Sequence, residues 1–387
     1  MPPTLWLSCH VAYACRHSGA CCRSGWPLPV DDRVVARLDA AVGSGRLRTE
    51  DGSVLWLRET ADAPRGMAGT FRMIGDACVF HTAGPAGPTA SAHPPIRHCA
   101  VHAALGHHAL PATCQHFPRV CLIDGRGVRV SLSHFCPTAA AMLVDAVAPV
   151  TIVPGPPAIA GPGAPDVPEG LDAREHLPPH LTARVLMDPE GMTSWEAHLV
   201  ATLAGPEALS GSVDAVLARL AADAARLTRW TPAAGTLADA VQGLRRPARV
   251  ADPAPPATMT PADAYAIGQR ACRPPWTWPE LPANLAQLDA RWVAPHWSAI
   301  SGVVRRYLAG KAFAAWIAYQ ADAALALVAS LMLAHTVLRV ECARAAGASG
   351  RGLDRDTLIA ALREADRLLV HHADSARLAQ ALSHRRH

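Results

Sequence analysis

The chain has 387 residues, half of them hydrophobic, which excludes a disordered protein and leaves room for two or three domains. Its 36 basic and 32 acidic residues nearly balance, and the sequence shows no polybasic run of the kind that binds a phosphate backbone. Nucleic acid is therefore not an expected partner. Ala, Leu and Val dominate the apolar residues, so we expect a mainly α fold.

The first third of the chain predicts short, mixed elements. The N-terminal residues "MPPTLWLSCHVAYACRH" lack the basic start and apolar centre of a signal peptide. The stretch "VDDRVVARLDAAV" (30–42) predicts a short helix. The stretch "PRVCLIDGRGVRVSLS" (118–133) predicts a β-hairpin that turns at "DGRG", and "CPTAAAMLVDAV" (136–147) predicts a following helix.

The rest of the chain predicts helices after a break rich in Pro and Gly. Apolar residues recur at spacings of three and four from Val213 to Leu227, as on one face of a helix. The stretch 298–344 predicts two or three buried helices, and Asp356 or Thr357 is expected to cap a last one. The apolar run 323–338 is shorter than the roughly 20 residues of a membrane span. We therefore expect a buried core helix, no membrane span and a cytoplasmic protein.

The cysteines are crowded toward the N-terminus, where nine of the 11 lie within the first 136 residues. Cysteines of a cytoplasmic protein are reduced, metal-bound or catalytic, and this crowding indicates a thiolate-rich metal or iron–sulfur site. We therefore predict a metal-bound, cysteine-rich domain with a small β-hairpin at 1–146. A Pro/Gly-rich linker at 147–192 and an α-helical domain at 193–387 follow.

The sequence neighbours of each cysteine indicate whether it is a metal ligand or a core residue. Cys21 and Cys22 are the strongest candidates because the glycines around them permit a tight turn; a reactive redox pair is the alternative, since a vicinal disulfide would be strained. Cys121 lies in an apolar strand and is expected in the core, as are Cys272 and Cys342, and Cys9 stays open. Seven cysteines near turns or element edges are the predicted metal ligands: Cys15, Cys21, Cys22, Cys78, Cys99, Cys114 and Cys136.

These motifs, in this order, resemble a known family. The segments "CCRSGW", "CVFH", "CAVHAALG", "CQHFPR" and "SLSHFCPTAAAML" are similar to those of a cysteine-cluster family described as a putative zinc- or iron-chelating domain. The similarity is closer to its flagellin lysine-N-methylase branch. The later segments "ISGVVRRYLAGKAFAAWI" and "EADRLLVHHADSARL" resemble that branch more loosely. Ser18 departs from the pattern, because the wider family often has a cysteine at this place.

The resemblance implies transfer of methyl groups from S-adenosylmethionine to lysine side chains of a protein such as flagellin. A Rossmann-type binding motif for S-adenosylmethionine would have a Gly-rich turn directly after a strand. The Gly-rich stretches at 42–46 and 346–352 follow predicted helices instead, so the sequence shows no such motif. Two hypotheses follow. In one, an iron–sulfur cluster, of the 4Fe–4S type, or a zinc ion serves a lysine methylase. In the other, the protein is a non-enzymatic zinc- or iron-binding module.

Overall fold

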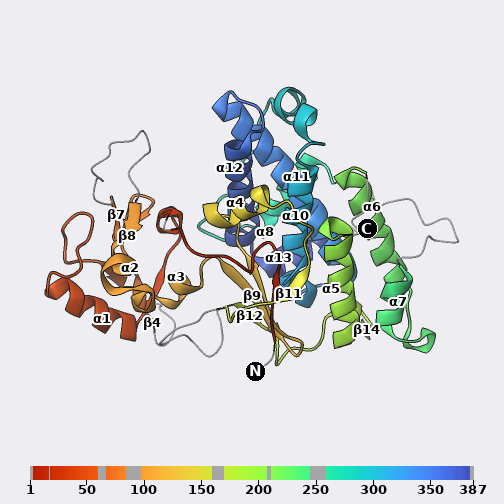
Figure 1. Cartoon of the computed structure of the whole chain (residues 1–387), viewed down its shortest axis with the longest axis horizontal. Helices are drawn as coiled ribbons and strands as arrows, with labels where there is room; N and C mark the ends of the chain where they lie inside the picture. The colour runs from red at the N-terminus through yellow and green to blue at the C-terminus, as the bar shows by residue number, and fades with distance from the viewer. Residues whose placement is uncertain are drawn as a thin grey trace.

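The structure is a computed structural model that describes residues 3–16, 18–59, 67–83, 97–158, 170–206, 211–244 and 259–383. It is about 53% helical, which confirms the prediction of a mainly α fold. In Figure 1 the N-terminal elements form a lobe on one side, a sheet lies in the middle, and the C-terminal helices pack on the other side.

The N-terminal lobe (residues 18–116) combines short strands and short helices. Its elements are η1 (Ala20–Arg23), β2 (Pro29–Asp31), α1 (Asp32–Gly43), β3 (Leu57–Glu59), β4 (Met67–Phe71), β5 (Met73–Ile74), β6 (Ala77–Cys78), β7 (His81–Ala83), β8 (Arg97–Cys99), α2 (Ala100–Leu105), η2 (His107–Ala109) and α3 (Ala112–His116). Strands pair in the order β2-β4-β3, β5-β6 and β7-β8. A hydrophobic cluster that includes Val30, Leu38, Trp56 and Phe80 holds these elements together.

Helix α1 confirms the helix predicted near residues 30–42. Asp31 precedes it, and the Asp31 side chain accepts hydrogen bonds from the backbone N–H groups of Arg33 and Val34. Such an N-cap satisfies donors that the first turn of a helix leaves free. The helix then buries Val34 and Leu38 against the short strands.

A five-stranded sheet lies between the lobe and the C-terminal helices. Its strands are β1 (Thr4–Leu7), β9 (Arg119–Asp124), β10 (Gly127–Leu132), β11 (Ile152–Pro154) and β12 (Gly170–Asp172), in the order β11-β1-β10-β9-β12. Strands β9 and β10 are antiparallel and pair Asp124 with Gly127, which confirms the predicted hairpin. Strand β1 runs parallel to β10, so the residues that follow both strands emerge at one edge of the sheet.

The central strands of the sheet are buried on both faces, since neighbouring residues of one strand pack into different hydrophobic clusters. Trp6 and Cys121 belong to a small cluster with Cys136, whereas Leu7 and Leu122 belong to the large core of the C-terminal helices. Side chains alternate between the two faces of a strand, which explains this division. The sheet therefore connects the N-terminal third of the chain with the rest.

Helices of the C-terminal part surround the long helix α11 (Ala323–Ser349). The other elements are α4 (Pro137–Asp145), β13 (His180–Thr182), β14 (Val185–Leu186), α5 (Pro189–Ala204), α6 (Val213–Leu227), η3 (Pro232–Ala234), α7 (Leu237–Gly243), α8 (Pro261–Ala271), α9 (Leu285–Leu288), η4 (Asp289–Val293), η5 (Ala294–His296), α10 (Ser301–Ala312), η6 (Trp316–Tyr319), α12 (Arg355–Asp366), η7 (Arg367–His372) and α13 (Ser375–Ser383). The helices predicted after Pro137 and from Val213 to Leu227 are confirmed.

Helix α11 contains the apolar run that we expected in the core. It is the one helix in the described ranges that is long and apolar enough to cross a membrane by length and composition, and 72% of its most apolar window is buried in the protein. Leu327, Leu331 and Leu338 are fully enclosed. The run therefore packs inside the bundle, as the sequence predicted.

Two details differ from the sequence analysis. The N-cap of α12 is Asp354, whose side chain accepts a hydrogen bond from the Thr357 N–H, so the helix begins earlier than a cap at Asp356 or Thr357 implies. The Pro/Gly-rich stretch contributes β11 and β12, which are the two edge strands of the sheet. Edge strands tolerate prolines because one side of the strand has no partner to pair with.

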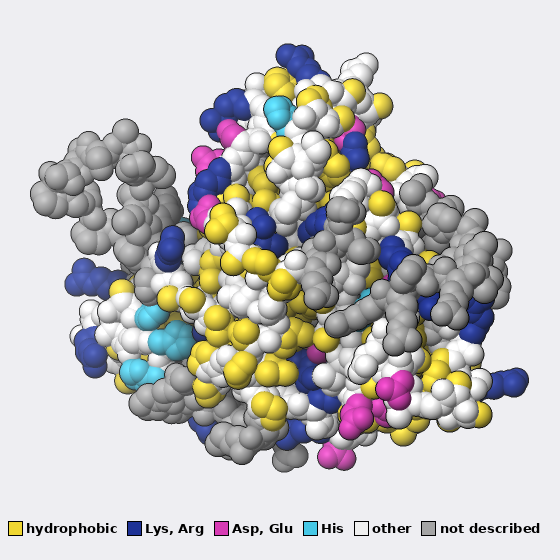
Figure 2. All heavy atoms as spheres, turned by 45° about the vertical axis from the view of Figure 1, so that its right-hand side comes forward, with side chains coloured by type: hydrophobic (Ala, Val, Ile, Leu, Met, Phe, Trp, Pro, Cys, Tyr) yellow, Lys and Arg dark blue, Asp and Glu magenta, His cyan; other side chains and the backbone are white. Residues whose placement is uncertain are grey.

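The hydrophobic clusters also show how the predicted segments pack. Leu122, Ala140 and Leu143 lie in the same cluster as the C-terminal helices, although they precede residue 146. The division into 1–146, 147–192 and 193–387 stays a prediction. On the face shown in Figure 2, Lys and Arg side chains are scattered among acidic and apolar ones and form no continuous patch.

Candidate functional site

The first feature of the candidate site is a group of cysteines in the N-terminal lobe. Cys21 and Cys22 lie on η1, which begins after Gly19 in the left-handed conformation, at φ 68°. Cys78 ends β6, and Cys99 ends β8 and is the residue directly before α2. These three segments are separated by more than fifty residues of sequence from first to last, and the lobe brings them together.

We call Cys21, Cys22, Cys78 and Cys99 the thiol cluster, because their sulfur atoms interact with one another. The Cys22 thiol is the hydrogen-bond partner of both Cys21 and Cys99. These bonds lower the pKa of Cys99 to about 7 and lower the pKa of Cys21, and they raise the pKa of Cys22. Cys22 therefore holds its proton between two neighbours that are more easily ionised.

Cys78 completes the thiol cluster from the strand side. Burial, with smaller contributions from the nearby Cys99 and Cys21, raises the pKa of the Cys78 thiol to about 12. Within the described ranges, no group of three or more His, Cys, Asp or Glu side chains is already spaced to hold a metal ion. The four thiols are thus close neighbours in a buried setting and not a preformed coordination sphere.

The other three predicted ligands occupy different places. Cys114 packs against the same hydrophobic cluster as the thiol cluster. Cys136 is the N-cap residue of α4, and its Sγ lies 3.6 Å from the Tyr13 hydroxyl. Cys15 is exposed and acts electrostatically on Tyr13 as well, which helps to raise the pKa of that phenol above its usual value after burial has raised it most. The structure thus divides the predicted ligands between the lobe and the surroundings of Tyr13.

Two of the three cysteines that we expected in the core are fully buried there. Cys121 is fully buried in β9, and Cys342 is fully buried in α11. Cys272 is half-buried at the end of α8 and packs against the large core. Cys9 also packs against the large core, and burial raises the pKa of the Cys9 thiol to about 11.

An aromatic contact connects the thiol-bearing segment with the C-terminal helices. Trp26, four residues after Cys22, stacks on His371 with ring centroids 4.3 Å apart and also approaches Phe135 at 5.0 Å. The His371 Nε2 atom lies 2.7 Å from the Ser133 hydroxyl oxygen. Burial lowers the pKa of His371 to about 3, so this imidazole is neutral at physiological pH.

The second feature of the site is a buried polar cluster that sequence reasoning missed. We call His10, His134, Tyr307, Lys311 and Asp366 the Asp366 cluster. Its members come from the residues after β1, the residues after β10, helix α10 and the end of α12. They meet beyond the ends of the parallel strands β1 and β10, where the sheet contacts the helices.

Asp366 is the centre of this cluster and is completely buried. One carboxylate oxygen accepts hydrogen bonds from the His134 backbone N–H at 2.5 Å and from His134 Nδ1 at 3.1 Å. The other accepts from the Tyr307 hydroxyl at 2.9 Å and from Lys311 Nζ at 2.5 Å. Burial works to raise the pKa of Asp366, but the charge of Lys311 and the hydrogen bonds from His134 and Lys311 outweigh it and hold that pKa far below its usual value.

Two histidines extend the cluster away from Asp366. His134 Nε2 lies 3.2 Å from His10 Nε2, and both side chains are fully buried. Burial lowers the pKa of each imidazole below its usual value, and Lys311 lowers both further. The His10 Nδ1 atom is buried and has no hydrogen-bond partner in the described part of the chain.

A signal for this cluster was present in the sequence. Lys311 is the single lysine among 36 basic residues, all the others being arginines. The Lys311 ammonium group is largely buried and pairs with the carboxylate of Asp366. His134 lies inside the quoted segment "SLSHFCPTAA", but neither residue was singled out as functional.

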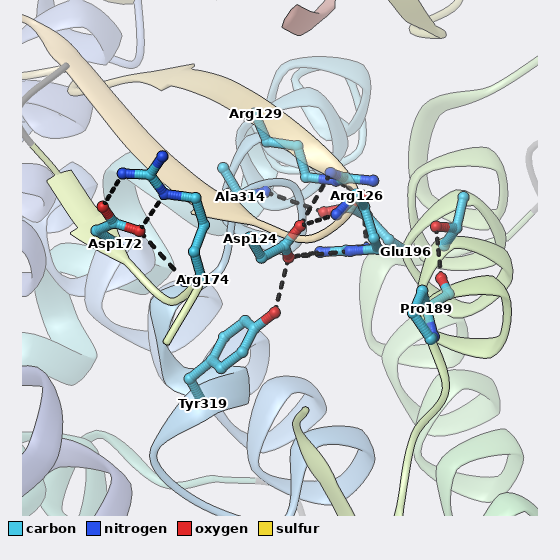
Figure 3. A network of polar contacts seen from close by, with 10 residues as sticks. Asp124, Arg126, Arg129, Asp172, Arg174, Pro189, Glu196, Ala314 and Tyr319 are labelled. Atoms are coloured by element: carbon cyan, nitrogen blue, oxygen red, sulfur yellow. Dashed lines mark hydrogen bonds and ion pairs between the residues drawn. The ribbon is translucent and has the colours of Figure 1, made fainter. Parts of the chain in front are cut away.

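A separate ionic network at the tip of the β9–β10 hairpin is drawn in Figure 3. Glu196 accepts a hydrogen bond from Arg129 Nε at 2.7 Å, and Arg126 lies 2.7 Å from Asp124. The Tyr319 hydroxyl also donates to Asp124 at 2.7 Å. Two guanidinium groups and two carboxylates neutralise one another here, so this network stabilises the contact between hairpin and helices.

No protein-family model, no curated protein and no solved structure matches this chain. The features that can indicate a function are therefore the thiol cluster, the Asp366 cluster and the contact of Trp26 with His371 between them.

Proposed function

We propose that this chain is a metalloprotein of the cysteine-cluster type, in which Cys21, Cys22, Cys78 and Cys99 bind a zinc ion or a 4Fe–4S cluster. The observation that carries the proposal is the mutual contact of Cys22 with Cys21 and with Cys99. Within the described ranges, Cys21, Cys22 and Cys99 interact with other thiols and with backbone groups. Such a group of buried thiols favours a metal ion, because the metal compensates the charge of the thiolates.

The chemistry of the donor set fits either metal. Four thiolates are the usual ligands of structural zinc and of a 4Fe–4S cluster, and soft sulfur donors select these metals over magnesium or calcium. When bound, the group would supply bonds that connect η1, β6 and the β8–α2 junction. Val79 and Phe80, which are fully enclosed, belong to the same hydrophobic cluster as Cys22 and Cys78 and would keep water away from such a group.

The activity in this proposal is methyl transfer from S-adenosylmethionine to lysine side chains of a protein such as flagellin, in the cytoplasm. It is supported by the resemblance of the cysteine motifs and of the later helical segments to the flagellin lysine-N-methylase branch. The second candidate is a non-enzymatic zinc- or iron-binding module. The buried Asp366 cluster favours the enzyme, because buried groups with strongly shifted pKa values gather at functional sites.

Metal analysis tests the first part of the proposal. The protein is purified without oxygen, and iron, sulfide and zinc are measured per chain. We expect bound metal in the wild type and its loss in Cys22→Ser and Cys99→Ser. Cys272→Ser is the matched control, because Cys272 is a half-buried thiol outside the thiol cluster. Retention of full metal in Cys22→Ser would refute the ligand assignment.

Methyl transfer is tested separately on metal-loaded protein. Flagellin and unrelated lysine-rich proteins are offered with labelled S-adenosylmethionine, and methylated lysines are located by mass spectrometry. We expect label on flagellin lysines and little on the other proteins. Absence of transfer to any of them, with the metal present, would favour the non-enzymatic module.

A further inference from the structure

Two histidines at the surface of the N-terminal lobe belong to neither of the clusters described above. The rings of His102 and His107 have their centroids 5.6 Å apart, with an angle of 64° between the ring planes. His107 is exposed and His102 is half-buried, so an ion in solution can reach them. Figure 2 shows histidine side chains, in cyan, gathered on this lobe. We call His102 and His107 the histidine pair.

The turn at the end of α2 brings the histidine pair together. Helix α2 ends at Leu105, and Gly106 follows with φ 86°, a conformation that is almost confined to glycine. The Gly106 N–H donates to the His102 carbonyl oxygen at 3.0 Å. The chain reverses there, and η2 places His107 against the helix that has just ended. A Cβ at position 106 would also lie 3.3 Å from the His108 ring.

The spacing and the hydrogen bonding of the two rings suit a metal ion. Two imidazoles bound to one tetrahedral zinc, with Zn–N bonds of about 2.0–2.1 Å, have ring centroids about 5 Å apart. A small rotation of the exposed His107 ring covers the difference from the observed spacing. His107 also donates a hydrogen bond to the Gln115 backbone carbonyl. That bond holds the proton on one ring nitrogen and leaves the lone pair of the other for a metal, as in many metal-binding histidines.

The donors and charges of the histidine pair indicate which metal binds and how strongly. Neutral imidazole suits zinc and similar divalent cations, whereas magnesium and calcium prefer oxygen ligands. Partial burial and the charge of Arg119 lower the pKa of His107, so this ring is neutral and ready to bind at physiological pH. Arg119 also repels a bound cation, and no third His, Cys, Asp or Glu completes a site in the described ranges. We therefore expect weak, reversible binding with water as the remaining ligands.

The position of the histidine pair relates it to the thiol cluster. His102 lies three residues after Cys99, in the first turn of α2, and its backbone N–H donates a hydrogen bond to Cys99 Sγ. One helical turn therefore separates a surface imidazole from a thiol of the lobe interior. Four thiolates bind zinc more strongly than two imidazoles beside an arginine, so an ion at the histidine pair is driven toward the thiol cluster.

We propose that the histidine pair is a second metal site, which captures a zinc ion from solution and passes it to the thiol cluster. The delivery step rests on the proposed function in its zinc form, whereas capture needs no thiolate. During delivery, each cysteine ligand releases its thiol proton to water as its bond to zinc forms, and the two Zn–N bonds break. Zinc keeps its charge throughout, so the step needs no oxidant or reductant.

Capture is tested by equilibrium dialysis of the full-length protein, purified without oxygen and with its metal bound, against zinc. Metal analysis should find one zinc ion per chain in addition to the metal of the thiol cluster, and His107→Ala should lose this additional ion. His108→Ala is the matched control, because His108 is also exposed and follows His107 directly, and it should keep the ion. An equal additional zinc content in all three proteins would show an adventitious ion only and overturn the site.

Delivery is tested on metal-free protein under reducing conditions, with cobalt(II) as the probe. Charge transfer from thiolate to cobalt reports when the metal arrives at the thiol cluster. We expect His107→Ala to fill about tenfold more slowly than the wild type and His108→Ala, with the same final absorbance. The equal final absorbance shows that the thiol cluster is intact, so the slower filling cannot come from misfolding. Equal rates in the three proteins would refute delivery through the histidine pair.

Cys22→Ser separates this inference from the proposed function. This variant should lose the metal of the thiol cluster and still bind one zinc ion that His107→Ala removes. If Cys22→Ser keeps all of its metal, the ligand assignment of the thiol cluster fails, and the His107→Ala result still decides capture. If Cys22→Ser loses the additional zinc ion as well, there is one site rather than two, and the histidine pair is refuted.

Discussion

The ion pair between Lys311 and Asp366 gives the sharpest prediction for stability. Asp366 is completely buried and lies 2.5 Å from Lys311 Nζ, and it also accepts from Tyr307 and His134. Removing one partner of a buried pair leaves an uncompensated charge and costs about 3–5 kcal/mol. We therefore expect Asp366→Asn and Lys311→Met each to lower the free energy of unfolding by about that amount.

The double variant distinguishes a coupled pair from two independent losses. With both charges gone, no unpaired charge remains, so the double variant should cost no more than about the larger single change. Urea unfolding followed by circular dichroism gives the three free energies of unfolding. Asp145→Asn is a control, because its partner pair with Arg355 is about half exposed, and it should have a far smaller effect. Costs that simply add would refute the coupling.

The contribution of Asp366 also has a defined dependence on pH. Its pKa in the folded protein is held well below the unfolded value of about 3.9. The stabilisation is therefore fully present above about pH 3.9 and is lost as pH falls toward the folded pKa. The difference in free energy of unfolding between wild type and Asp366→Asn should shrink below about pH 4, and a constant difference would contradict this.

Three further predictions concern other parts of the protein. In metal-free protein, alkylation of Cys99 by iodoacetamide, followed by mass spectrometry, should reach half its maximal rate near pH 7, since hydrogen bonding lowers the pKa of Cys99 to about 7; a midpoint above that of a free thiol would contradict it. Glu196→Ala should lower the free energy of unfolding by about 3–5 kcal/mol, because the buried Arg129 loses the closer of its two carboxylate partners, and a loss below about 1 kcal/mol would refute the network's importance. Gly268→Ala should cost about 1–3 kcal/mol in urea unfolding, because a Cβ there would lie 2.3 Å from Trp278; an unchanged midpoint would show that Trp278 moves aside.

Local patterns in the sequence predicted local structure well. The turn "DGRG" between alternating apolar residues predicted the β9–β10 hairpin, and a spacing of three and four predicted α6. Both signals depend on contacts between residues near each other in the chain. The strands β11 and β12 were not predicted, because their pairing depends on distant strands and their sequences are too short to show a period.

The two clusters differ in how far the sequence could predict them. Cys21, Cys22, Cys78 and Cys99 were selected from their crowding, since cysteine is rare and its grouping is conspicuous. That Cys22 lies between two thiols follows from packing in the lobe, and no spacing rule could give it.

The Asp366 cluster could not be assembled from the sequence. Its histidines lie 124 residues apart, and His134 and Asp366 lie 232 residues apart. The sheet and the bundle bring them together, and no local pattern marks the meeting point. The one usable signal was the solitary Lys311, which composition shows only when lysine and arginine are counted separately.

X-ray absorption spectroscopy of the anaerobically purified protein tests the central claim most directly. We expect a zinc or iron edge with a first shell made of sulfur at about 2.3 Å, and the loss of that shell in Cys22→Ser. A first shell of nitrogen or oxygen ligands at about 2.0–2.1 Å would contradict a metal held by the thiol cluster. So would a sulfur shell that is unchanged in Cys22→Ser.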